Sequence, residues 1–191
     1  MEPAYKLLTV EEFLDSCPND ERHYELFDGV IVAMAPPAIA HQRIAGNLAF
    51  ELGAAVRANR PDCAVGSQAG IAPQELSGRN YFEADIVVTC RLANDYRGIN
   101  AEPLLIVEIQ SPSTERDDHF VKLPQYQVIP SAEEILYVES ERVAATIYRR
   151  DPAENWQAIE VAGPQARLQL RTIGLDIPLS ALYRGVPGLG I

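Results

Sequence analysis

The sequence lacks the features that mark a membrane or secreted protein. No apolar run approaches the roughly 18 residues needed to span a bilayer, and the start, MEPAYKLLTVEEF, has neither the basic residues nor the long apolar stretch of a secretory signal. Internal repeats, low-complexity tracts and linkers are also missing. We therefore expect one globular domain over residues 1–191, without a membrane partner.

Cysteine is scarce as well. The three cysteines, Cys17, Cys63 and Cys90, are odd in number, widely spaced and form no CxxC pair. This pattern predicts neither a disulfide framework nor a zinc site, and a reducing cytoplasm is the simplest location.

Basic residues are outnumbered by acidic ones. Lys and Arg total 16 against 27 Asp and Glu, which gives a net charge of −11. A non-specific nucleic-acid binder usually carries a basic stripe, because its affinity comes from neutralising phosphates. The charge therefore argues against a DNA-coating protein. It does not exclude a nuclease, since a metal-dependent active site would account for part of the excess acid.

The apolar pattern predicts a mixed α+β domain with a central sheet flanked by helices. The long helix is the clearest element, because apolar residues recur at every fourth position from Ile44 to Val56. Thr9 and Glu12 have the spacing of a capping box, and Asp28-Gly29 suits a tight hairpin turn. The predicted segments are helices at 9–16, 40–58 and 115–128, strands within 62–73, 84–90, 103–110 and 155–161, hairpins at 23–34 and 133–150, and a helical turn at the end of 175–185.

Two acids stand at the ends of apolar strands. Asp85 comes just before Ile-Val-Val, and Glu108 follows Leu-Leu-Ile-Val. If these consecutive strands pair antiparallel, the two carboxylates come together, and strand alternation puts Gln110 on the same face as Glu108. Facing carboxylates repel unless a cation lies between them or one is protonated. Mg²⁺ suits such a place, since it binds one or two carboxylates and keeps waters for substrate phosphates.

Lys122 lies fourteen residues past Glu108, on a segment that could fold back over the strand ends. Its ammonium would stabilise charge developing on a phosphate. The plainer interpretation is that strand-end acids meet solvent and that Asp118 and Lys122 form an ordinary surface ion pair. Pro124 also argues against a regular helix around Lys122. For His41, capping or packing of the long helix is favoured over lining a pocket.

Several stretches, taken in their order and spacing, resemble the Uma2 family of restriction-endonuclease-like proteins. They are YELFDGVIVAMAP, HQRIAGNLAFEL, ADIVV, PLLIVEIQSPST, and Lys122 with Tyr126. The likeness runs from about Thr9 to the tail. It implies the PD-(D/E)XK nuclease fold, a central mixed sheet flanked by helices, with metal-dependent phosphodiester hydrolysis as the ancestral chemistry.

The resemblance also implies what individual residues do. Asp85, preceded here by alanine rather than proline, takes the place of the first motif acid, and Glu108 matches the second; both would bind metal. Lys122 matches a lysine that this family carries on the following helix, where it would orient or activate the attacking water. Glu25 matches a further acid that would assist. Gln110 stands where many relatives of the fold have a lysine, and would hydrogen-bond the water or a phosphate oxygen.

The sequence thus supports two hypotheses. The first is a Mg²⁺-dependent endonuclease, with Mn²⁺ as an alternative metal, DNA as substrate, no small-molecule cofactor and a homodimer suited to double-strand cutting. The second is a catalytically inactive module that keeps the fold for binding or assembly, since fold does not fix function. No separate DNA-reading motif is visible, so specificity is expected from loops such as 70–82 and 91–102.

Overall fold

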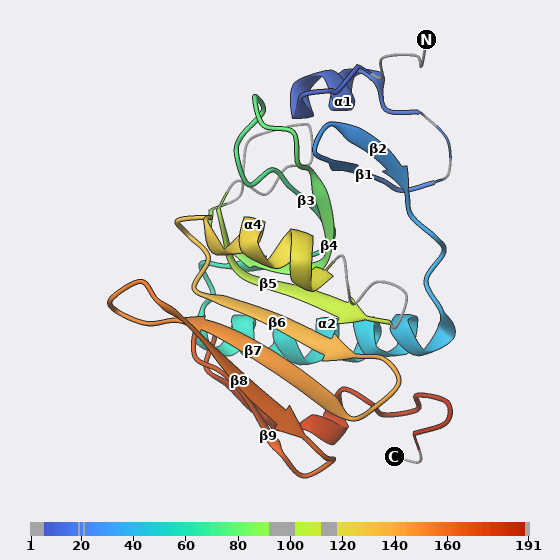
Figure 1. Ribbon diagram of the computed structural model, residues 1–191. Coiled ribbons are helices and arrows are strands. Elements are labelled where there is room, and N and C mark those ends of the chain that lie inside the picture. Colours follow the sequence, from blue (N-terminus) through green and yellow to red (C-terminus); the bar gives the residue numbers. More distant parts are fainter. Residues whose placement is uncertain (1–5, 19, 21, 92–101, 112–117, 190–191) are drawn as a thin grey trace.

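The structure is a computed structural model that describes residues 6–18, 20, 22–91, 102–111 and 118–189 (Figure 1). It confirms the expected mixed α+β class with a central mixed sheet. In chain order its elements are α1 (Val10–Ser16), β1 (Tyr24–Phe27), β2 (Val30–Ala33), α2 (Ile39–Asn59), β3 (Ala64–Ile71), β4 (Phe82–Thr89), β5 (Pro103–Gln110), a π-helical turn (Asp118–Lys122), α4 (Leu123–Gln127), β6 (Glu134–Glu139), β7 (Ala144–Arg150), β8 (Trp156–Ala162), β9 (Arg167–Leu170), β10 (Leu175–Pro178) and a 3₁₀ turn (Leu179–Ala181).

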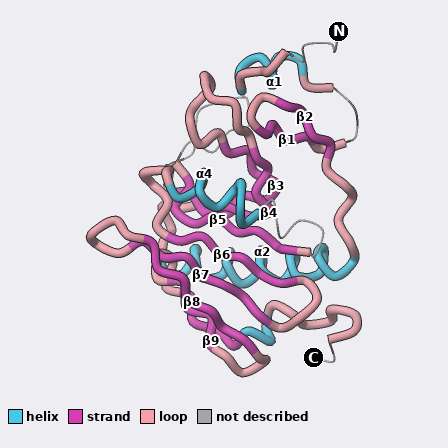
Figure 2. Tube along the Cα trace, viewed as in Figure 1, coloured by secondary structure: helices cyan, strands magenta, loops and turns pink. Residues whose placement is uncertain are grey.

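The central sheet has six strands in the order β3-β4-β5-β6-β7-β8 (Figure 2). The pairing of β5 with β6 is parallel, whereas all other neighbouring pairs in this sheet are antiparallel. The hairpins β1–β2 and β9–β10 form two separate two-stranded sheets. The mixed pairing arises because the chain crosses over through α4 between β5 and β6, whereas hairpins or loops join the other strands.

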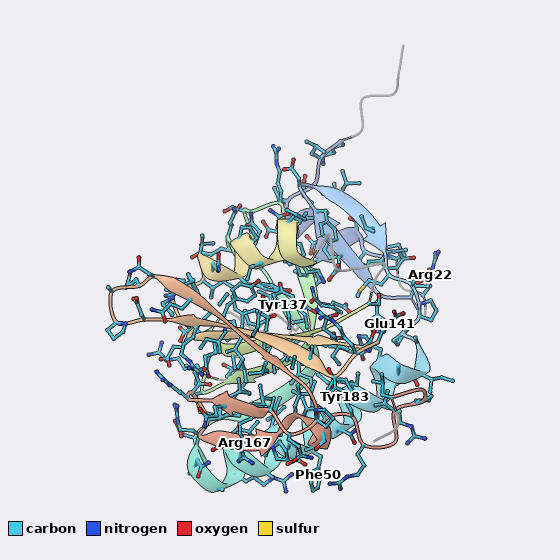
Figure 3. All side chains as sticks on the ribbon, turned by 60° about the horizontal axis from the view of Figure 1, so that its bottom comes forward. Arg22, Phe50, Tyr137, Glu141, Arg167 and Tyr183 are labelled. Carbon is cyan, nitrogen blue, oxygen red and sulfur yellow. A yellow bond between two sulfur atoms is a disulfide. The ribbon has the colours of Figure 1, made fainter. Side chains whose placement is uncertain are left out.

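The two faces of the sheet are covered by different helices. On one face α2 packs its apolar side against β3, β4 and β5, and Tyr183 belongs to the same cluster. On the other face Tyr126 of α4 packs with Tyr137 of β6. Figure 3 shows Tyr137 on the side of α4 and Tyr183 on the opposite side of the sheet. The central strands are therefore buried on both faces, which explains why their sequences are continuous apolar runs.

Helix α2 confirms the four-residue periodicity of its sequence. Ile44, Leu48, Leu52 and Val56 are all buried. Each such side chain stabilises the fold by about 1.5–3 kcal/mol relative to an exposed one, so this apolar stripe fixes the helix on the sheet. No helix in the described part of the chain is long and apolar enough to cross a membrane.

The N-terminal elements also follow their local signals. Thr9 and Glu12 form both hydrogen bonds of the capping box at α1. At the β1–β2 turn Asp28 and Gly29 have φ angles of 44° and 83°, the left-handed region that a two-residue hairpin turn requires.

The regular helix predicted over 115–128 is wrong in part. The chain forms a π-helical turn at Asp118–Lys122 and only then the short helix α4, while residues 115–117 lie outside the described ranges. Pro124 falls in the first turn of α4, where its missing N–H costs little. A proline that would break a helix interior is therefore accommodated by starting the α-helix one residue earlier.

The prediction that the cysteines form no disulfide is also wrong. Cys63 and Cys90, 27 residues apart, are disulfide-bonded, whereas Cys17 is free. They meet because Ala64 pairs with Thr89 at the end of the β3–β4 ladder, and the two cysteines are the next residues outward. The spacing of the cysteines in the sequence does not predict this strand register, so the disulfide could not be predicted from it. The cysteines therefore no longer support a cytoplasmic location, which stays a prediction.

The C-terminal segment packs as its sequence suggested. Leu179, Leu182 and Tyr183 are buried against the α2 face of the sheet. The β9–β10 hairpin that precedes them was not resolved into two strands from sequence, because each strand has only four residues.

Candidate functional site

The register of β4 and β5 places the two predicted acids on neighbouring strands. The strands are antiparallel, with Ile86 opposite Val107, so Asp85 and Glu108 each lie one residue beyond this pair. Asp85 is held in place by its neighbour strand: its Oδ2 accepts a hydrogen bond of 2.7 Å from the backbone N–H of Ile109. The antiparallel pairing of β4 and β5, from which we expected Asp85 and Glu108 to lie close together, is thus present.

Lys122 turns inward from the π-helical turn and meets two carboxylates. Its Nζ lies 2.9 Å from Glu25 Oε1 and 3.4 Å from Glu108 Oε1. All three side chains are at most 7% exposed. Asp118, the alternative partner, has a side chain outside the described residues, so the structure shows the buried arrangement and does not bear on the surface pair.

This cluster concentrates charge in a dry place. One ammonium lies between two carboxylates, and the ring of Phe82 approaches it at 5.9 Å from the ring centroid. Burying ions costs several kcal/mol each, which mutual attraction offsets only when the geometry is good. Such an arrangement is a poor way to gain stability, and buried charge clusters occur both at functional sites and in structural ion-pair networks.

Tyr126 completes the surroundings of Glu108. Its hydroxyl donates a hydrogen bond of 2.6 Å to Glu108 Oε1. Burial raises the pKa of Tyr126 well above its usual value, and the negative charge of Glu108 raises it further. The hydroxyl therefore stays protonated and serves as a fixed donor. The family resemblance includes Tyr126 but assigns it no contact; its i,i+4 spacing from Lys122 was the available signal in the sequence.

Glu25 comes to the cluster from the N-terminal hairpin. It is the second residue of β1, and its Oε1 also accepts a hydrogen bond of 2.9 Å from the backbone N–H of Glu83. Leu26 and Tyr81 exchange backbone hydrogen bonds of 2.8 and 2.9 Å, which fixes β1 to the start of β4. The hairpin thereby brings Glu25 into the site, as the resemblance implied.

His41 of α2 contacts Asp85. Its Nε2 is 3.1 Å from Asp85 Oδ1 and 3.2 Å from Oδ2, and both side chains are 20% exposed. Of the two roles expected for His41, capping of the long helix is wrong, because Ala38 is the N-cap and α2 has no side-chain cap; packing stays a prediction. The position of His41 in the first turn instead points the imidazole at the carboxylate.

Gln110 is buried at the end of β5 with its amide unsatisfied. The side chain is 3% exposed, and its Nε2 has no hydrogen-bond partner within the described residues. A buried donor without a partner costs about 1–3 kcal/mol, so such groups call for an explanation. An acceptor brought by substrate or by a site water would satisfy it.

The donor chemistry of the site suits a hard divalent cation. Asp85 and Glu108 supply carboxylate oxygens, the ligands that Mg²⁺ takes, and one or two of them are enough. No three His, Cys, Asp or Glu side chains of this site gather their ligand atoms within 4.8 Å in the described part of the chain. With these two carboxylates as its protein ligands, a bound Mg²⁺ would keep several waters.

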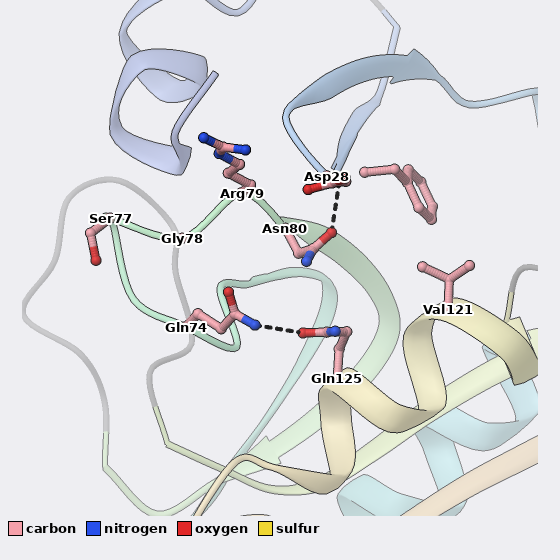
Figure 4. Close-up of a pocket in the computed structure, with 9 residues that line it drawn as sticks. Asp28, Gln74, Ser77, Gly78, Arg79, Asn80, Val121 and Gln125 are labelled. Carbon is pink, nitrogen blue, oxygen red and sulfur yellow. Dashed lines mark hydrogen bonds between the residues drawn. The ribbon is translucent and has the colours of Figure 1, made fainter. Parts of the chain in front are cut away.

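A pocket of about 690 Å³ opens beside the cluster, between the β1–β2 turn, the β3–β4 loop and α4 (Figure 4). Val121 and Gln125 line it, while their chain neighbours Lys122 and Tyr126 face Glu108. Gln125 Oε1 accepts a hydrogen bond of 3.2 Å from Gln74 across the pocket, as Figure 4 shows. The pocket thus shares one short helical segment with the charged site.

Loop residues 74–80 provide most of the opposite wall of the pocket, including the exposed Arg79. They fall within 70–82, one of the loops from which specificity was expected; most of the other, 92–101, lies outside the described residues.

Comparisons with known proteins show the family and the fold of the chain. The profile of the Uma2 family, described as "Putative restriction endonuclease", matches residues 10–180. The chain is 29% identical over 181 residues to the uncharacterized protein slr1290 of Synechocystis sp., covering 94% of this chain and 93% of that protein. It is also similar, at a TM-score of 0.76 and 17% identity, to a crystal structure titled a putative nuclease belonging to DUF820 from Anabaena variabilis. That alignment covers 93% of this chain and 98% of the other, and it shows a shared fold.

Proposed function

Because this chain belongs to the Uma2 family, described as "Putative restriction endonuclease", we propose that it is a metal-dependent endonuclease that hydrolyses DNA phosphodiester bonds. One observation carries the proposal: the buried Lys122 ammonium lies between Glu25 and Glu108. A pure scaffold gains little from such a cluster, since apolar residues of similar volume stabilise a core as well or better.

Asp85 and Glu108 would hold the metal, Mg²⁺ or Mn²⁺. When bound, such an ion polarises a phosphate and lowers the pKa of a bound water, which generates a nucleophile at neutral pH. The backbone N–H of Ile109 and the imidazole of His41 orient Asp85, and the hydroxyl of Tyr126 orients Glu108.

The chain's other groups act on the substrate and its water. The Lys122 ammonium stabilises negative charge that develops on the phosphate oxygens, an effect that is strong in a site closed to water. The free N–H of Gln110 donates to the attacking water or to a phosphate oxygen. Together these two donors supply the positive potential that a lysine on the strand would otherwise provide.

Substrate selection falls to the pocket beside α4. Its amide-bearing wall, with Gln74 and Gln125, can donate to and accept from base edges, and Arg79 can contact a phosphate. The net charge of −11 opposes non-specific DNA binding, so productive binding depends on such local contacts. A homodimer, which would present two sites to one duplex, remains a prediction.

Metal binding separates this proposal from the inactive assembly module. Mg²⁺ and Mn²⁺ are titrated by calorimetry into the wild type, Glu108→Gln and, as a matched control, Glu160→Gln, whose carboxylate is exposed on β8. We expect binding by the wild type and the control and none by Glu108→Gln. Absence of binding by the wild type would remove the metal site and leave the module as the better account.

A further inference from the structure

The disulfide between Cys63 and Cys90 closes the open end of the β3–β4 pair. Cys90 is five residues from Asp85 along the extended chain, about 17 Å at 3.4 Å per residue. The disulfide therefore lies apart from the proposed nuclease site. Both cysteines are partly exposed, so the disulfide does not lie in the closed core.

An arginine is fixed against one of the two sulfurs. Arg60, which follows α2, donates a hydrogen bond of 3.2 Å from Nη2 to Cys90 Sγ. Its Nη1 donates a hydrogen bond of 2.9 Å to the carbonyl of Thr172, and its Nε lies 3.6 Å from Asp62 Oδ1. These three contacts fix the guanidinium, so its positive charge lies next to the Cys90 sulfur.

The same cluster could suggest a metal site, because ligand atoms of Asp62, Cys63 and Cys90 all lie within 4.8 Å of one another. The charge distribution decides against it. The two sulfurs are bonded to each other, and the Arg60 guanidinium contacts both Cys90 and Asp62, where it repels a cation. A positive group beside sulfur instead stabilises a thiolate.

The free cysteine has the opposite surroundings. Burial raises the pKa of the Cys17 thiol, and the nearby carboxylates of Glu83 and Asp20 raise it further. Cys17 is therefore a weak nucleophile and does not compete as an exchange partner. It serves as an internal reference for thiol counting.

We propose that Cys63–Cys90 is a site of reversible thiol–disulfide exchange with low-molecular-weight thiols, with Arg60 stabilising the Cys90 thiolate. A small thiolate attacks Cys63 Sγ, which breaks the protein disulfide and forms a mixed disulfide, and Cys90 leaves as a thiolate beside Arg60. A second small thiolate attacks the non-protein sulfur of the mixed disulfide and releases the Cys63 thiolate. Two electrons pass from two small thiols, which become one small disulfide, and the two protein thiolates take up the protons.

Thiol counting in glutathione buffers tests this proposal on the folded protein. Wild type is incubated at set ratios of reduced to oxidised glutathione and quenched with acid. It is then labelled in denaturant, where every free thiol including Cys17 is accessible, with a maleimide polymer that shifts its position on a gel. We expect two populations, one with a single label at Cys17 and one with three labels, whose ratio follows the buffer reversibly. Circular dichroism confirms that both are folded.

Substitutions at Arg60 test the mechanism. Because a less stable thiolate leaves more slowly, Arg60→Gln should slow reduction by about threefold or more. Arg60→Lys, which keeps the charge, should react close to the wild-type rate, as should Arg57→Gln, which removes an exposed arginine from the same helix. Reduction only after unfolding, failure of the bond to form in oxidised glutathione, or equal rates in all variants would overturn the proposal.

Discussion

At the scale of single residues, Lys122 is the group whose surroundings are hardest to explain by stability. Its charged side chain is only 7% exposed. Two carboxylates contact it, and the Tyr126 hydroxyl is bonded to one of them. Removing the ammonium leaves Glu25 and Glu108 as buried charges without their shared counter-ion. The structure therefore predicts that substitutions here affect both folding and any chemistry.

Replacement of Lys122 by methionine, an unbranched side chain one atom shorter, should lower the free energy of unfolding by about 3–5 kcal/mol, the usual cost of breaking a buried ion pair. Urea unfolding measures it. Adding Glu25→Gln should recover part of the loss by removing one of the two facing charges. Lys6→Met provides the control, because Lys6 is exposed and its pair with Glu12 contributes little. Equal stability of wild type and Lys122→Met would contradict the buried pair.

His41 is predicted to position a metal ligand. Substitution by alanine releases the Asp85 carboxylate from one of its two orienting contacts, and changes in such supporting groups lower metal affinity by about 10–100-fold. Calorimetric titration of Mn²⁺ into His41→Ala should show this weakening, whereas the adjacent Gln42→Ala should bind as the wild type does. Unchanged affinity in His41→Ala would show that the contact is only packing.

The same residues show how far sequence reasoning reaches. The approach of Lys122 to Glu108 was predictable, because strand ends and a following segment of limited length leave few places for it. The contact of His41 with Asp85 was not, since it depends on how α2 crosses the sheet. For the contact of Tyr126 with Glu108 the sequence offered only the i,i+4 spacing from Lys122, which does not show that the two residues follow a π-helical turn.

At the scale of elements, a buried acid joins the central sheet to the β9–β10 hairpin. Glu134 on β6 is 1% exposed and accepts a hydrogen bond of 2.7 Å from Arg149. It also accepts bonds of 3.0 Å from the backbone N–H and 2.7 Å from the hydroxyl of Thr172. This satisfied network belongs to the architecture and is separate from the candidate site.

Glu134→Ala should therefore destabilise the protein by about 3–5 kcal/mol, because Arg149 loses its carboxylate partner and Thr172 loses its hydrogen-bond acceptor. The metal affinity at Asp85 and Glu108 should stay unchanged. Thermal unfolding and calorimetry at a temperature where the variant is folded give the two values. The neighbouring Glu133 is exposed, so Glu133→Ala should change neither. A loss of metal affinity in Glu134→Ala would join two regions that the structure separates.

Elements with strong local signals were predictable, and those set by long-range pairing were not. Local sequence alone determines three of these features: the capping box of α1, the Asp28-Gly29 turn and the periodicity of α2. The disulfide depends on the β3–β4 register, and the short strands of β9–β10 have too few residues to alternate clearly. The position of Pro124 in the first turn of α4 was not predictable, because it depends on the π-helical turn that precedes this helix.

At the scale of the whole molecule, buried tyrosines predict instability in alkali. Burial raises the pKa of Tyr81 to about 12 and those of Tyr126 and Tyr183 above the usual value near 10. The folded state therefore keeps protons that the unfolded chain releases. The stabilisation is complete below about pH 10, and the free energy of unfolding falls as pH rises beyond it.

Urea unfolding between pH 8 and pH 11, as rough bounds around the tyrosine pKa, measures this slope. Tyr126→Phe removes one titrating group and should give a shallower decline above about pH 10 than the wild type, even though it loses the bond to Glu108. Parallel curves for the two proteins would contradict a Tyr126 pKa that is raised by folding.

The central claim is that this buried cluster is a nuclease site, and cleavage of supercoiled plasmid with Mg²⁺, and with a chelator in its place, tests it most directly. The account predicts that wild type and Glu160→Gln cut only with metal. Glu108→Gln should lose cleavage, and folded Lys122→Met should be slower by about 100–1,000-fold, the usual effect of removing one preorganised charge-stabilising group. A wild type that binds DNA without cutting it, or a Glu108→Gln variant that cuts at the wild-type rate, would contradict the account.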